Sequence, residues 1–241
     1  MATLTDLEKK QIAQAEEIFF SGPQKEGFCK DLFFGRFRDQ SIMPYPELPE
    51  ASKKLGDEIL ARVTSYCENE IDPAQIDRDA EIPDRIVKGL GDIGVLGMTI
   101  ETKYGGLGMC QQNFCRIMEV IGGHCGSTAV FVNAHHSIGL RALELFGTEE
   151  QKTRWMGPLA RGEQTAAFAL TEPEAGSDAG NVRTRAELAS DGEGYVLNGE
   201  KRWITNGGIA DVVTVMARTP DPADPDGKIT AFLFPRESPG F

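Results

Sequence analysis

Two polar, glycine-containing strings in the second half of the chain carry residue types that suit a planar ring with a phosphate tail. The first, AAFALTEPEAGSDAGNVRT, covers residues 166–184, and the second, GEKRWITNG, covers residues 199–207. Gly176 and Ser177 belong to a loop that can offer backbone amides and a hydroxyl to a phosphate. In the second string, Trp203 offers an aromatic face and Thr205 offers a hydroxyl for a ring edge. These residue types predict a site for a flat, phosphate-bearing cofactor.

A strand and a loop must position the first string, and a strand must position the second. Residues 165–170 form a short apolar run typical of a buried strand. Pro173 ends this strand because proline lacks the amide hydrogen that a ladder needs. A strand over the WIT segment points Trp203 and Thr205 to one face and Ile204 to the other. Two ordinary interpretations stand beside the cofactor site: a plain strand-to-loop exit for the first string and a core tryptophan for the second.

Helical patterns come first in the chain, and strand patterns follow. Amphipathic helices are expected over residues 6–20 and 24–34, and Thr148 with Gln151 forms a capping-box signature. Between residue 34 and Thr148, apolar residues recur at helical spacing. They are Leu55, Ile59, Leu60, Val63 and Cys67, then Ile86, Val87, Leu90 and Ile93. From residue 165 onward, short β-prone runs alternate with turns, and PDPADPDG is expected to be an exposed hairpin loop.

This order predicts an α+β fold rather than alternating βαβ units. The predicted domains are a helical arm at residues 1–48, a helical domain at 49–162 and a β domain at 163–241.

The charge and the amino terminus exclude several classes of protein. The 241 residues carry a formal net charge of −12, which argues against general nucleic-acid binding because phosphate neutralisation requires clustered Lys and Arg. The amino terminus lacks the basic head and apolar core of a secretory signal, and no apolar run approaches the ~18 residues that span a bilayer. We therefore expect a cytoplasmic protein without an integral membrane segment.

The five cysteines are scattered and odd in number, which suits a reducing compartment better than a disulfide framework. A metal site could be assembled on paper from Cys110, Cys115, His124, Cys125, His135 and His136. However, adjacent residues point about 100° apart on a helix, and the chain has no paired CxxC motif. We expect these side chains to be packed or solvated, and we expect no metal site.

Taken together, the two strings resemble the acyl-CoA dehydrogenases, flavoenzymes that introduce a double bond between the α and β carbons of acyl-CoA thioesters. The resemblance runs from about Phe28 to the last residue, and segments such as GGLGMCQQNFCRIMEVIG and AHHSIGLRALELFGTEEQK are similar to the very-long-chain branch. It implies an amino-terminal all-α domain followed by part of an antiparallel β-barrel domain. It also implies FAD as cofactor, acyl-CoA as substrate, electron-transfer flavoprotein as electron acceptor and a homo-oligomer for the full-length protein.

The resemblance also assigns roles to residues of the two strings. The implied FAD-binding residues are Phe168, Leu170, Thr171, Gly176, Ser177, Trp203, Ile204 and Thr205. Ser177 is in addition the implied contact to acyl-CoA. Two positions depart from the family pattern: Phe168 stands where many members have tyrosine, and Glu174 replaces a small residue.

The resemblance places the catalytic base on a glutamate of a carboxyl-terminal helical domain, and the sequence stops at Phe241. The chain is therefore expected to be a fragment of the dehydrogenase, inactive alone and without a catalytic residue. Glu172, Glu174 and Asp178 are weighed as substitute bases, but turn-stabilising carboxylates are the preferred interpretation. The alternatives are a non-catalytic module that binds flavin or acyl-CoA, and an acyl-CoA oxidase relative.

Overall fold

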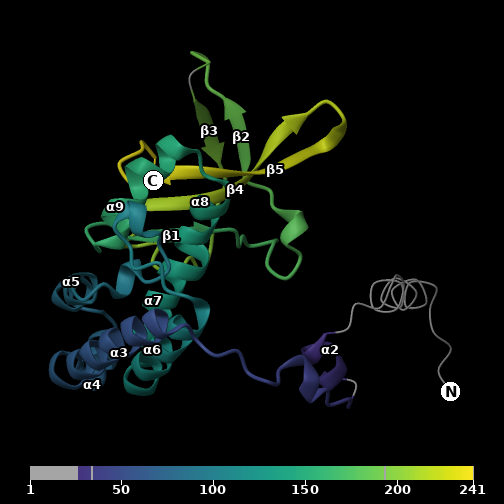
Figure 1. Ribbon diagram of the computed structural model, residues 1–241. Helices are drawn as coiled ribbons and strands as arrows, with labels where there is room; N and C mark the ends of the chain where they lie inside the picture. Colours follow the sequence, from purple (N-terminus) through teal and green to yellow (C-terminus); the bar gives the residue numbers. More distant parts are fainter. Residues whose placement is uncertain (1–26, 34, 193, 241) are drawn as a thin grey trace. The chain divides into compact units, whose positions relative to one another are not determined.

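The computed structural model describes residues 27–33, 35–192 and 194–240 (Figure 1). The chain divides into two units, Met1–Leu48 and Pro49–Phe241. The division falls at the end of the proline-containing stretch MPYPELP. The helix expected over residues 6–20 lies outside the described residues, as do the first residues of the helix expected over 24–34.

The described part of the first unit contains helix α2 (Phe28–Phe33) and the 3₁₀ turn η1 (Asp39–Ser41). The rings of Phe28 and Phe37 meet edge to face with centroids 5.9 Å apart. Arg38 Nε lies 3.0 Å from Asp31 Oδ2.

Helices make up the first part of the second unit. They are α3 (Glu50–Glu70), α4 (Pro73–Asp79), α5 (Asp84–Asp92), α6 (Gln111–His124), α7 (Gly126–Ala134), α8 (Arg141–Phe146) and α9 (Glu149–Ala160), with 3₁₀ turns η2 (Val95–Gly97) and η3 (Thr102–Tyr104) and the π-helical segment η4 (His135–Leu140). The predicted capping box is confirmed: Gln151 N donates to Thr148 Oγ1, and Thr148 N donates to Gln151 Oε1. None of the helices within the described ranges is both long and apolar enough to cross a membrane.

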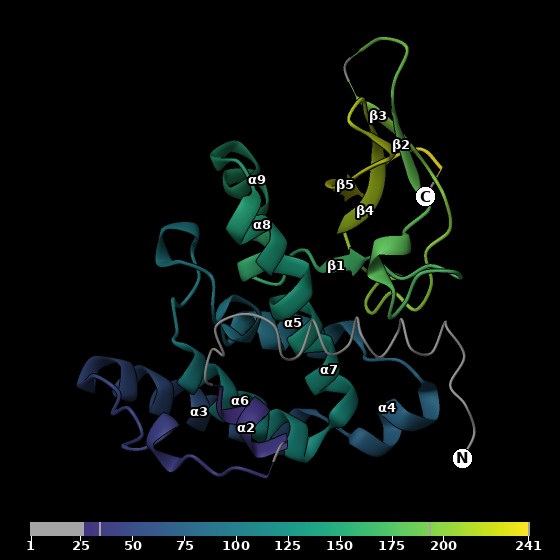
Figure 2. The ribbon, with the colours of Figure 1, turned by 90° about the vertical axis from the view of Figure 1, so that its right-hand side faces the viewer.

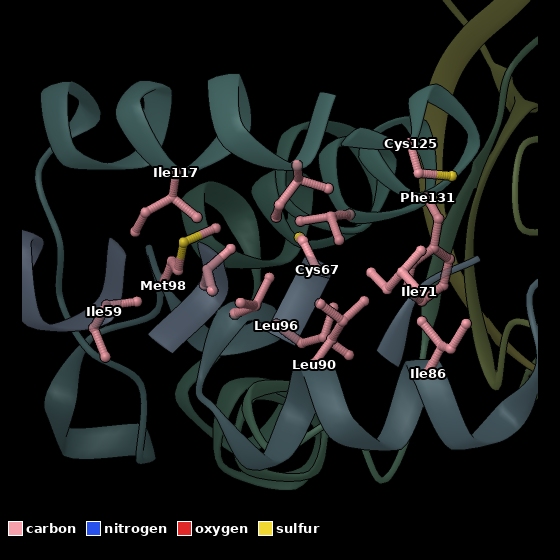
Figure 3. Close-up of a cluster of buried hydrophobic side chains, with 14 of the residues drawn as sticks. Ile59, Cys67, Ile71, Ile86, Leu90, Leu96, Met98, Ile117, Cys125 and Phe131 are labelled. Atoms are coloured by element: carbon pink, nitrogen blue, oxygen red, sulfur yellow. The ribbon is translucent and has the colours of Figure 1, made fainter. Parts of the chain in front are cut away.

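The helical core lies between α3, α5, α6 and α7, and Figure 3 shows its apolar side chains. On α3, Ile59, Val63 and Cys67 are buried, and they follow the four-residue spacing that places side chains on one helix face. Leu90 of α5 and Ile117 of α6 are fully buried against this stripe. The core stripe expected from the sequence is therefore confirmed.

A sheet follows the helices. Its strands are β1 (Ala166–Ala169), β2 (Arg185–Leu188), β3 (Tyr195–Asn198), β4 (Val212–Asp221) and β5 (Asp224–Pro235), with the 3₁₀ turn η5 (Ala179–Asn181) between β1 and β2. The order β1-β4-β2-β3, with β5 on β4, combines parallel β1–β4 and β2–β4 pairs with antiparallel β2–β3 and β4–β5 pairs. The expected helical domain followed by a sheet domain is confirmed, and the sheet of the described strands is mixed. PDPADPDG forms the turn end of the β4–β5 hairpin.

The start of β1 is fixed by the helical part of the same unit (Figure 2). Ala166 N donates to His135 Nδ1 at 3.4 Å. A Cβ added to Gly139 would lie 2.8 Å from Ala166 O, so only glycine allows η4 to approach the strand this closely. Thr165 N donates to Asp211 Oδ2 at 2.8 Å, which joins the starts of β1 and β4. The strand with which the first string begins is thereby anchored at its first residue.

Candidate functional site

The first string leaves β1 and forms a compact turn. Glu172 and Ala175 exchange two backbone hydrogen bonds, of 2.8 Å from Glu172 N and 3.3 Å from Ala175 N. Asn181 Nδ2 donates to Glu174 O at 2.9 Å and closes the loop that follows. Gly176 and Ser177 lie in this loop and are exposed. The loop can therefore present backbone amides and a hydroxyl to a ligand.

The second string does not form the expected strand. Trp203 lies in a bend with φ of 58°, and a turn covers residues 205–209. Asn206, with φ of 64°, accepts backbone hydrogen bonds from Ile209 at 3.0 Å and Ala210 at 2.8 Å. The turn-forming residues Asn206 and Gly207 outweigh the β-propensity of the WIT segment because no neighbouring strand pairs with it in the described sheet. The prediction that strand alternation orients Trp203 and Thr205 is wrong.

Trp203 is an exposed aromatic residue on a strained backbone. The residue is 87% exposed, so the core-tryptophan interpretation is also wrong. Positive φ is uncommon for a bulky residue and costs on the order of 1–3 kcal/mol. The surrounding turn holds this conformation through Gly207 N to Ile204 O at 2.9 Å and through Asn206 Nδ2 to Phe131 O of α7 at 3.3 Å.

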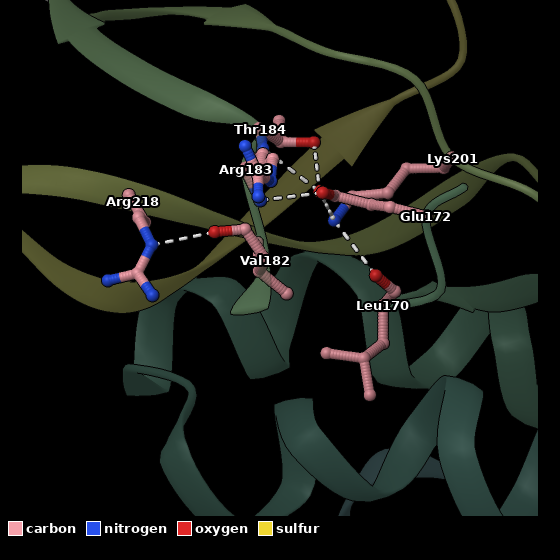
Figure 4. A network of polar contacts seen from close by, with 7 residues as sticks. All are labelled: Leu170, Glu172, Val182, Arg183, Thr184, Lys201 and Arg218. Carbon is pink, nitrogen blue, oxygen red and sulfur yellow. Dashed lines mark hydrogen bonds and ion pairs between the residues drawn. The ribbon is translucent and has the colours of Figure 1, made fainter. Parts of the chain in front are cut away.

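The structure brings the two strings together where residues 170–172, just after β1, meet residues 201–202, just after β3 (Figure 4). Arg202 N donates to Thr171 O at 2.8 Å. Lys201 Nζ donates to Leu170 O at 3.0 Å and forms an ion pair with Glu172 at 2.7 Å. Phe168, Leu170, Thr171, Ile204 and Thr205 are half-buried around this junction or beside it in the chain. The segments that carry the predicted site residues therefore belong to one structural assembly.

The carboxylate of Glu172 is the centre of that assembly. It accepts hydrogen bonds from Arg183 N at 2.6 Å, Thr184 N at 3.0 Å and the Thr184 hydroxyl, in addition to the ion pair with Lys201. Burial raises the pKa of Glu172, but the hydrogen bonds from Lys201, Thr184 and the two backbone amides outweigh burial and hold the pKa at about 2. A carboxylate held ionised by four donors fits the turn-stabilising role and suits a general base poorly.

Two depressions border the second string. One, of about 460 Å³, lies over the sheet, and its lining includes Ala169, Thr184, Leu197, Lys201, Val213 and Phe234. The other, of about 480 Å³, lies between the helical part and the turn, and its lining includes Ile82, Val87, Phe131, Thr165, Asn206 and Asp211. Ile204 lines both depressions. This residue therefore links the sheet side of the turn to its helical side.

The histidines and cysteines considered as metal ligands lie apart from this junction. His136 bonds Thr99 Oγ1 at 2.9 Å and Val95 O at 2.7 Å, and His124 Nε2 lies 3.0 Å from Ile71 O. The five cysteines are free thiols. In the part of the chain that the structure describes, no three His, Cys, Asp or Glu side chains gather in a way that could hold a metal ion.

Known proteins share both halves of this arrangement. The family description "Acyl-CoA dehydrogenase, N-terminal domain" matches residues 56–163, and "Acyl-CoA dehydrogenase, middle domain" matches residues 167–241. The crystal structure of an acyl-CoA dehydrogenase complexed with FAD from Bacillus anthracis aligns with a TM-score of 0.69 and 36% identity, over 78% of this chain and 32% of that one. The chain belongs to the acyl-CoA dehydrogenase family.

Curated acyl-CoA dehydrogenases match the chain over nearly its whole length. The human mitochondrial very long-chain specific acyl-CoA dehydrogenase is 37% identical over 235 residues, which cover 95% of this chain and 35% of the relative. A Mycobacterium tuberculosis protein described as a "Probable acyl-CoA dehydrogenase" is 39% identical over 242 residues, which cover 100% of this chain and 37% of the relative. The chain spans about a third of the length of these relatives.

Sequence reasoning overlooked three residues that hold the two strings in their observed arrangement. Lys201 and Thr184 complete the shell of Glu172, and Asn206 sets the turn after Trp203. The sequence carried a signal for Asn206, since asparagine tolerates positive φ and is common in turns. It carried no signal that would pair Glu172 with Lys201, because only the fold brings these positions together.

Proposed function

We propose that this chain supplies flavin-binding and acyl-CoA-binding residues of an FAD-dependent acyl-CoA dehydrogenase. The reaction is α,β-dehydrogenation of fatty acyl-CoA thioesters, and FAD, when bound, supplies the hydride acceptor that no side chain can provide. The residues proposed to hold FAD are Phe168, Leu170, Thr171, Gly176, Ser177, Trp203, Ile204 and Thr205. Ser177 is also proposed to contact acyl-CoA.

One observation carries the proposal: Trp203 is 87% exposed and held at positive φ, directly after the Arg202 amide that bonds Thr171 O of the first string. An exposed indole lacks the favourable free energy of burial, and its positive φ adds a further unfavourable free energy. Packing within this chain therefore gives no reason for the conformation. A planar ring laid against the indole would recover about 25 cal/mol for each Å² of apolar surface buried. The exposed indole therefore supports the proposal that this turn receives the flavin ring.

Glu172 is a poor candidate for the base that removes the substrate proton. Glu172 is saturated by its donors, and its low pKa makes it a weak acceptor at neutral pH. We assign no catalytic base to the two strings.

Electron-transfer flavoprotein as the electron acceptor and a homo-oligomeric assembly belong to the same proposal. One relative is described as mitochondrial and another comes from a bacterium, so the cytoplasmic localisation stays a prediction.

Trp203→Ala is expected to weaken FAD binding about tenfold or more, a change of ~1.4 kcal/mol, because the ring loses its apolar wall. Equilibrium titration of the chain with FAD measures the effect, and circular dichroism checks that the fold is retained. Phe146→Ala is the matched control, since Phe146 is 83% exposed on α8, an element outside the two strings. Equal FAD affinity in wild type and Trp203→Ala would rule out the ring-packing role.

A further inference from the structure

The ion pair between Glu172 and Lys201 differs from the surface ion pairs of this chain in its burial. The Lys201 side chain is 12% exposed and that of Glu172 is 4% exposed, whereas Lys88 and Asp92 on α5 are 75% and 62% exposed. Exposed pairs contribute little to stability, but a buried pair strongly constrains the groups around it because neither charge can be left alone. The buried pair thus restricts the segments that carry it.

The pair connects three segments at once. Arg183 N and Thr184 N fix the Glu172 carboxylate to the segment that enters β2. Lys201 then reaches across from the second string to that carboxylate and to Leu170 O. Arg202 N bonds Thr171 O one residue farther along. The backbone of the second string is thereby held against the first string immediately before Trp203.

The pair also cancels the charge of its own buried carboxylate. A buried carboxylate without its lysine would place an uncompensated negative charge at the start of the loop that carries Ser177, the proposed contact to FAD. Like charges at short range oppose binding, and the low dielectric of a buried site strengthens the effect. Lys201 compensates this charge without being offered to the ligand as a free cation, since it already donates to two acceptors.

We infer that Glu172 and Lys201 form a clasp that pre-orients the Trp203 turn and the Ser177 loop for FAD. Both act as positioning residues, and the inference rests on the proposed function. With the clasp closed, little conformational entropy is lost when the ligand binds. With the clasp open, the turn and the loop sample other arrangements, and the affinity falls in proportion to the fraction that is competent.

The test uses the double variant Glu172→Gln/Lys201→Met in the whole chain. Glutamine keeps an acceptor for the backbone amides, and methionine fills the lysine's path without charge, so neither variant residue leaves a buried charge unpaired. FAD titration is expected to give an affinity about tenfold weaker or more. In the FAD-free chain, hydrogen exchange at the Arg202 amide is expected to accelerate while that of the α6 amides is unchanged. Lys201→Arg, which keeps the charge and the donors, is expected to keep the FAD affinity and the Arg202 exchange rate closer to wild type than the double variant does.

Two controls separate positioning from general stability. Lys103→Met removes the exposed ion pair with Glu101 and should leave FAD affinity unchanged. Ile117→Val lowers stability through the helical core and should lower the melting temperature without changing FAD affinity. Glu172→Asp keeps the charge but shortens the side chain by one methylene, and it is also expected to weaken FAD binding. It serves as the second test if the double variant folds poorly.

The outcomes distinguish the clasp from the proposed function. Wild-type FAD affinity in the double variant and in Glu172→Asp overturns the clasp, and the proposed function stands. The clasp is also overturned if Ile117→Val loses as much FAD affinity as the double variant for the same drop in melting temperature. A wild-type chain that binds no FAD overturns the proposed function and, with it, the role of the clasp in flavin binding. Unchanged Arg202 exchange in the double variant overturns the clasp without reference to FAD.

Discussion

Acidification from pH 7 to pH 4 is expected to lower the free energy of unfolding by on the order of 6 kcal/mol, about 3 from each ring, because two neutral histidines are buried at the joint between the helices and β1. Burial, with the neighbouring His136, lowers the pKa of His135 to about 3, and burial lowers the pKa of His136 to about 4, against an ordinary value of 6.5. As the pH falls below 6.5, the unfolded chain takes up protons that the folded chain does not. These two rings therefore do not change the stability above pH 6.5, and they lower it as the pH decreases from 6.5 toward 4 and 3.

Urea unfolding followed by circular dichroism at pH 7, 6, 5 and 4 measures this loss. The variant His135→Gln/His136→Gln is the comparison, because it removes both titrating rings while glutamine retains hydrogen-bonding groups for Ala166, Thr99 and Val95. Its unfolding free energy is expected to change less between pH 6.5 and 4 than that of wild type. A wild-type free energy that stays constant over this range would contradict the buried, neutral state of the two rings.

Local sequence patterns predicted the helical part well because the forces that form it act between near neighbours. The Thr148 capping box needs residues three apart, and the stripe of Ile59, Val63 and Cys67 needs residues four apart. Both patterns can be read without knowledge of the fold. The strand over Ala166–Ala169 was also predictable, since its apolar run is bounded by polar residues and a proline.

The candidate site was predictable in its residue types but not in its geometry. A strand requires a partner, and the WIT segment has none in the described sheet, so its strand propensity was overridden by the Asn206 turn. The pairing of Glu172 with Lys201 spans 29 positions and depends on how the chain returns to the first string. Burial of a charged residue is decided by that return path, which periodicity and composition do not encode.

Replacing Glu172 by alanine is expected to lower the free energy of unfolding by about 3–5 kcal/mol at pH 7, a typical cost of removing one partner of a buried pair. The reason lies in the donors that remain. Lys201 keeps its charge at 12% exposure, and Arg183 N and Thr184 N lose their acceptor. Glu174→Ala is the matched control, because its side chain is exposed two positions away, and its effect is expected to stay within about 0.5 kcal/mol. Urea unfolding of the three proteins measures the difference.

The pH dependence of that difference tests its electrostatic origin. The pKa of Glu172 is held at about 2, below the ordinary value of 4.5, so its contribution is present above pH 4.5 and is lost as the pH falls toward 2. The gap between wild type and Glu172→Ala should therefore be widest at neutral pH and should narrow between pH 4.5 and 2. A gap of the same size at pH 7 and pH 2.5 would mean that the side chain acts by filling space, whereas a shrinking gap requires the charged network around Lys201.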